Sequence, residues 1–146
     1  MSPKLTSGPF EDLRLLVDPF IAFAALGFVG PGGGAASEVK TPSAISAARA
    51  AGQAVAVCHM GAHALGAAAY AVEVVALATP DRQEVVKDEI NRQLHHMTPE
   101  VRAALRTLPL VGENSSGPLG PGLLAKGHRG AIVRDLQTGL AQSDPY

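Results

Sequence analysis

The sequence contains no tryptophan and one cysteine, and aromatic residues make up only 4% of its 146 residues. With Cys58 alone, an intrachain disulfide is excluded, and a reducing, cytosolic location is the natural expectation. Neither sign of charge dominates, because 12 Lys and Arg residues face 13 Asp and Glu residues. This balance argues against a nucleic-acid partner, since capture of nucleic acid requires a basic patch.

The sequence also lacks a convincing membrane span. The apolar run at residues 20–30 is 11 residues long, whereas a bilayer needs roughly 20. Residues 50–72 are uncharged and long enough, but Gln53, His59 and His63 lie near their middle. Those side chains are costly in lipid, so we expect no membrane association and treat a small membrane protein as a minor alternative.

What is abundant is alanine and glycine, a composition that favours closely packed helices over a sheet. Thr-Pro occurs three times, at positions 41, 79 and 98, and each pair precedes a helix-compatible run. Threonine can cap a helix and proline suits its first position, so we expect all three to begin helices. The predicted helices are residues 43–78, 81–97 and 100–108.

The predicted fold is therefore all-α: an Ala-rich helical bundle or array with one long central helix and irregular Gly/Pro-rich ends. We divide the chain into an irregular N-terminal segment with one short apolar helix, a helical core domain, and a Gly/Pro-rich, partly disordered tail: residues 1–40, 41–112 and 113–146. Within the tail, "GAIVRDLQTG" fits a strand or a short helix equally well.

A continuous helix over residues 43–78 would be roughly 54 Å long at about 1.5 Å per residue. A compact domain of this size has a diameter of only roughly 38 Å. The segment must therefore break, most readily at Gly52, Gly61 or Gly66, or pack against another subunit.

On a helical wheel, the polar side chains of this segment and some small residues share one broad stripe: Arg49, Gln53, Ala56, His59, His63, Gly66, Tyr70 and Glu73. Small residues between them, Gly52 among them, would let a second helix approach closely. We therefore predict that the two histidines lie at a helix–helix seam, with ring partners such as Gln53, Tyr70 or Glu73.

A metal site is the main alternative for His59 and His63, because histidines four apart on a helix can bind one ion. The sequence offers no third or fourth ligand nearby, and the glutamate of the zinc-protease signature is replaced by Met60. A pH-sensitive or partner-contacting role is a third alternative. No catalytic constellation and no cofactor motif is present in the sequence, so we predict a protein that is not an enzyme.

Two segments, "AARAAGQAVAVCHMGAHALGAAAYAVEVVAL" and "EINRQLHHMTPEVRAAL", resemble the immunity-protein-five-like family of bacterial polymorphic-toxin systems. The resemblance covers about residues 46–108. It is carried by a set of motif residues, predicted to be structural: Arg49, Gly52, Gln53, His59, His63, Gly66, Tyr70 and Gln93. It implies an all-helical fold and inhibition of a toxin by binding, without catalysis.

The chain departs from that family at both ends, where relatives resemble a longer helical array. It could therefore be a truncated or diverged member, or a small helical protein without a catalytic role. Half an array would leave apolar surface uncovered, which predicts self-association as a homo-oligomer. A polar face formed by Glu84, Asp88, Glu89 and Glu113 is a candidate toxin contact, although ordinary solvated surface is the simpler explanation.

Overall fold

The computed structural model describes residues 39–142, which form helices and loops and contain no strand. The elements are α3 (Pro42–Ala56), α4 (His63–Ala78), α5 (Arg82–His96), α6 (Pro99–Arg106), the short 3₁₀ helix η2 (Leu123–Ala125) and α7 (Gly127–Ala141). The predicted all-α class is confirmed. The short apolar helix expected within residues 1–40 lies outside the described residues.

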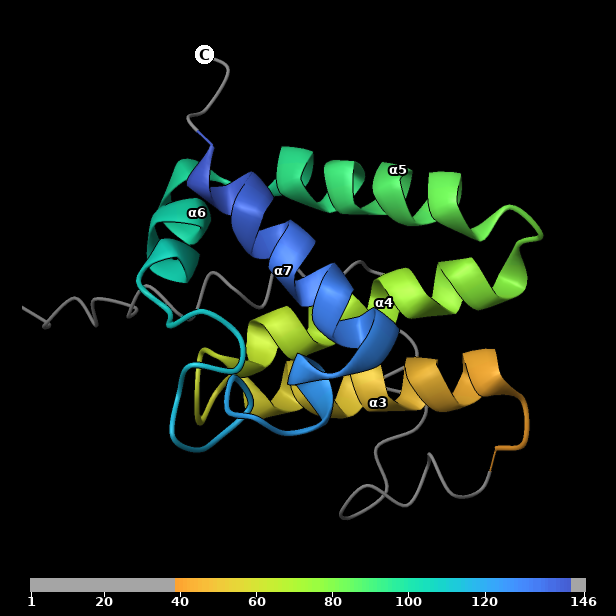
Figure 1. The fold of residues 1–146 in the computed structure, drawn as a ribbon, viewed down its shortest axis with the longest axis horizontal. Helices are drawn as coiled ribbons and strands as arrows, with labels where there is room; N and C mark the ends of the chain where they lie inside the picture. Colours follow the sequence, from red (N-terminus) through yellow and green to blue (C-terminus); the bar gives the residue numbers. More distant parts are fainter. Residues whose placement is uncertain (1–38, 143–146) are drawn as a thin grey trace, which may run out of the picture.

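Helix α4 occupies the middle of the fold (Figure 1). Helix α3 packs along one side of it, α5 lies along the opposite side, and α7 crosses both α4 and α5 diagonally. Helix α6 lies at the end of the molecule where α5 and α7 converge. Among residues 39–142, no helix is both long and apolar enough to cross a membrane.

The predicted central helix is not continuous, because it breaks at residues 57–62 into the antiparallel pair α3 and α4. Gly61, one of the three anticipated positions, lies within this turn. Helix α3 ends in tightened hydrogen bonds, with Val57 N donating to Ala54 O at 3.3 Å and His59 N donating to Ala56 O at 3.0 Å. Folding back in this way lets the alanine-rich faces of the two halves bury each other, which a protruding helix could not do.

Two of the three Thr-Pro predictions are confirmed. Thr41 and Thr98 cap α3 and α6, and their hydroxyl oxygens accept hydrogen bonds from Ala44 N at 3.3 Å and Val101 N at 3.4 Å. The prediction for Thr79 is wrong: this residue ends α4, and its hydroxyl donates to Val75 O at 3.0 Å. The residue before a proline is driven into extended conformation, so Thr79 stops one helix while the next begins only at Arg82.

The prediction of a separate tail at residues 113–146 does not match the structure. The segment "GAIVRDLQTG", for which the sequence left strand and helix open, is helical. It belongs to α7, whose Ile132, Val133, Leu136 and Leu140 lie in the same core as α4 and α5. The loop before it is also anchored, because Leu119 is fully buried. Residues 39–142 therefore form one core, and residues 143–146 lie outside the described part.

Candidate functional site

The predicted polar stripe is divided between two helices that face each other. Because α3 and α4 run antiparallel, residues far apart in the stripe meet across the seam. Ser46 Oγ donates to Glu73 Oε2 at 2.7 Å, and the Arg49 guanidinium lies 6.0 Å from the Tyr70 ring centroid. Nearest the turn, Gln53 Oε1 lies 2.8 Å from His63 Nδ1. The wheel thus placed Arg49, Gln53, His63, Tyr70 and Glu73 together, but it missed Ser46 and included His59, which lies outside the seam. The seam itself lies within the hairpin.

The Gln53–His63 contact depends on a glycine. A Cβ added at Gly66 would overlap Gln53 Oε1 and would lie 3.0 Å from Leu124 Cδ1. The amide of Gln53 can only occupy this space because position 66 has no side chain. Since Oε1 can only accept, His63 Nδ1 carries the proton and donates it.

Burial and a second histidine lower the pKa of His63 below its usual 6.5. Burial is the larger cause, because it removes water from the charged imidazolium, and repulsion from His59 is the smaller cause. The seam therefore favours a neutral His63 with one N–H directed at Gln53.

His59 does not lie in the seam. It sits in the turn between the helices and is exposed, so the prediction that both imidazoles line the junction holds for His63 alone. Gly52 is also exposed, and a Cβ there would meet nothing within 4 Å. Cys58 is exposed in the same turn as His59, and its thiol donates to Val55 O at 2.9 Å. Because the helix ends at Ala56, Cys58 and His59 lie in the turn and face solvent.

Glu73 joins the seam to the C-terminal helix. Arg129 of α7 donates from one terminal nitrogen to both carboxylate oxygens at 2.9 Å, and its guanidinium lies 4.4 Å from the Tyr70 ring centroid. The side chain of Glu73 is only 15% exposed and that of Arg129 only 19% exposed. Sequence reasoning missed Arg129, because the tail was treated as separate. The available signal was Tyr70 and Glu73, one helical turn apart, which together favour a cation.

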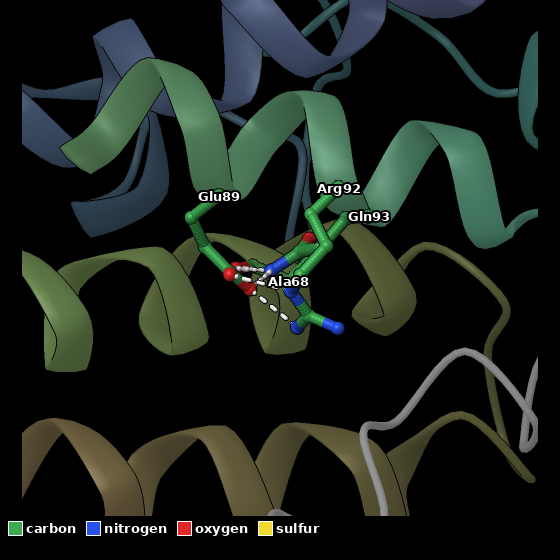
Figure 2. A network of polar contacts seen from close by, with 4 residues as sticks. All are labelled: Ala68, Glu89, Arg92 and Gln93. Carbon is green, nitrogen blue, oxygen red and sulfur yellow. Dashed lines mark hydrogen bonds and ion pairs between the residues drawn. The ribbon is translucent and has the colours of Figure 1, made fainter. Parts of the chain in front are cut away.

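Gln93 lies at the second seam, between α5 and α4 (Figure 2). Its side-chain nitrogen donates to Ala68 O at 3.3 Å and to Glu89 Oε1 at 3.0 Å. Arg92 donates to both carboxylate oxygens of Glu89 at 2.7 Å. Glu89 is therefore buried and turned toward α4, which removes it from the predicted acidic contact face.

The structure gives the metal alternative no ligand set. Within residues 39–142, no three His, Cys, Asp or Glu side chains come together in a way that could hold an ion. His95 and His96 lie exposed at the end of α5.

A groove of about 790 Å³ opens between α4, α5 and α7. Its lining includes Ala76, Ile90, Leu94 and Ile132 at the bottom and polar side chains at the edges. None of the eight motif residues lines this groove. The motif residues and this groove are therefore separate features.

Residues 33–100 match the family model of the Imm-5 like putative immunity protein. The match confirms the predicted resemblance, contains all eight motif residues and supports an immunity-protein role. It ends at the second residue of α6 and before α7, so it covers part of the chain. The comparisons with curated proteins and with solved structures found no significant match.

Proposed function

We propose that this chain neutralises a bacterial toxin by binding to it, and that its helices form a preformed surface which covers the toxin's active site. The observation that carries the proposal is the match of residues 33–100 to the Imm-5 like family, whose family description is that of an immunity protein. A cytosolic location fits this role, because the lone cysteine stays reduced there.

The seams support action by binding and not by catalysis. The two ionisable side chains of the seam that could act as an acid or a base are held by structural partners: His63 by Gln53, and Glu73 by Ser46 and Arg129. A general acid or base must reach a substrate proton, and a carboxylate held by a guanidinium and a hydroxyl is poorly placed to do so. The outer surfaces of the helices are then what the chain presents to a partner.

The test is co-expression with the protein encoded by the adjacent reading frame, which the proposal requires to be a toxin. We expect cells that produce the toxin to resume growth when this chain is present, and the two purified proteins to elute together in size-exclusion chromatography. Toxicity that persists at equal expression, or two proteins that elute separately, would contradict the proposal.

The same instrument, with light scattering, tests self-association of the chain alone. The small residues that could admit a second subunit are partly covered within the chain, because Gly66 and Ala62 are buried in the hairpin. A mass above that of one chain supports the expected homo-oligomer, and a strict monomer at high concentration counts against it.

A further inference from the structure

The groove between α5 and α7 has the shape of a V with α4 as its floor. The two helices meet at one end, where a Cβ added at Gly139 of α7 would overlap Leu94 Cδ1 of α5. From that contact the two helices diverge toward their N-terminal ends (Figure 1), and Arg82 and His128 near those ends are among the lining residues. The lining runs along α5 from Arg82 to Leu94, which is roughly 18 Å at about 1.5 Å per residue.

The walls have the composition of an interface, with an apolar centre and a polar rim. Val86, Ile90 and Leu94 of α5 recur every four residues and meet Ile132 of α7 at the bottom. Gln83, Lys87 and Asn91 form the α5 lip at the same spacing. The α7 lip carries Asp135, Thr138 and Gln142.

The two lips differ in charge. Arg82 and Lys87 make the α5 side basic, whereas Asp135 is the carboxylate that lines the groove from α7. Glu73 of α4 also lines the groove, but its charge is paired with Arg129. Glu84 and Asp88 of α5 are exposed but do not line the groove. A segment that fits here must therefore present an acidic edge to α5 and a basic edge to α7.

A helix suits this groove better than an extended segment does. The backbone groups of α5 and α7 are already paired within each helix, so the walls offer no row of free N–H and C=O groups to a strand. An extended segment on the apolar floor would leave its own backbone N–H and C=O groups buried and unpaired, which is unfavourable. A helix satisfies those groups internally and presents an apolar stripe.

We propose that this groove receives one amphipathic helix of the toxin, with its apolar stripe on α4 and its acidic edge along Arg82 and Lys87. The inference rests on the proposed function and names the surface through which it acts. About three turns of helix would lie in the groove.

The first test fills the groove. Ala131 is exposed and lines it, so Ala131→Trp places an indole where the toxin helix would lie. Ala103, an exposed alanine of α6 outside the groove, supplies the matched control Ala103→Trp. The titrant in calorimetry is the protein encoded by the adjacent reading frame. We expect Ala131→Trp to raise the dissociation constant at least about tenfold and Ala103→Trp to leave it within about twofold of the wild-type value.

The second test reverses charge without adding bulk. Lys87→Glu should weaken toxin binding and slow association, whereas the neighbouring Asp88→Lys, outside the groove, should not weaken it. Circular dichroism checks that each variant is folded. If Ala131→Trp does not fold, the binding of Lys87→Glu alone tests the groove. Wild-type binding at a different surface, with both groove variants binding normally, overturns the groove and leaves the proposed function standing. No binding by the wild type overturns both.

Discussion

Gln53 and His63 face each other across the turn between α3 and α4, with 2.8 Å between Oε1 and Nδ1. Ten residues separate them in the sequence, yet this contact fixes the register of the two antiparallel helices nearest their turn. Further along the seam, the same register brings Arg49 to Tyr70 and Ser46 to Glu73. The histidine that suggested a metal ligand in the sequence thus has a hydrogen-bonding partner in the fold.

The two glycines of the motif should respond oppositely to alanine. Gly66→Ala would push the Gln53 amide away from His63, and we expect it to lower the free energy of unfolding by about 1–3 kcal/mol. Gly52→Ala is exposed within α3 and should raise it by about 0.5–1 kcal/mol through helix propensity. Urea denaturation measures both, and equal effects of the two substitutions would argue against the seam as described.

The lowered pKa of His63 predicts that stability falls in mild acid. The unfolded chain binds the proton more readily than the folded chain does, so the contribution of His63 is fully present above pH 6.5. It is lost as the pH falls below that value, and the loss levels off below the folded-state pKa. His63→Asn, which keeps a donor near Nδ1, should remove this part of the pH dependence.

The measurement is urea denaturation between about pH 5 and 8, compared between wild type and variant. His96→Asn is the matched control, because His96 is exposed at the end of α5, and it should retain the wild-type dependence. An identical pH profile for wild type and His63→Asn would rule out the assignment.

The ion pair between Glu73 and Arg129 should contribute measurably to stability, because both side chains are mostly buried. Glu73→Gln leaves the guanidinium over Tyr70 without its counter-charge, and we expect a loss of about 2 kcal/mol in the free energy of unfolding. Asp88→Asn, exposed on α5, should change it by less than about 0.5 kcal/mol. Comparable losses for the two would show that α7 is not held to α4 in this way.

The sequence predicted the helices and most of the seam residues because both depend on local patterns. The Thr-Pro pairs located α5 and α6 to within a residue or two, and the wheel collected Gln53, His63 and Tyr70. It could not show that the helix folds back on itself. Length required a break, but whether it came at Gly52, Gly61 or Gly66 depends on which faces then bury each other.

The C-terminal part was beyond local reasoning for a different reason. Gly130 and Gly139 lie within α7, and both lower the helix propensity of this segment. In the fold they are sites of close approach: a Cβ at Gly130 would overlap Ala125 O, and one at Gly139 would overlap Leu94 Cδ1. Tertiary packing therefore decides this helix, together with the partner that Arg129 finds in Glu73.

The pairing of Gln53 with His63 distinguishes a structural seam from a metal-binding pair, and a double-mutant cycle measures it most directly. Gln53→Ala, His63→Ala and the double variant are compared with wild type by urea denaturation at about pH 7.5, where His63 is neutral. A hydrogen bond in the seam predicts that the two substitutions are non-additive, with a coupling free energy of about 1 kcal/mol. Strictly additive losses would contradict it.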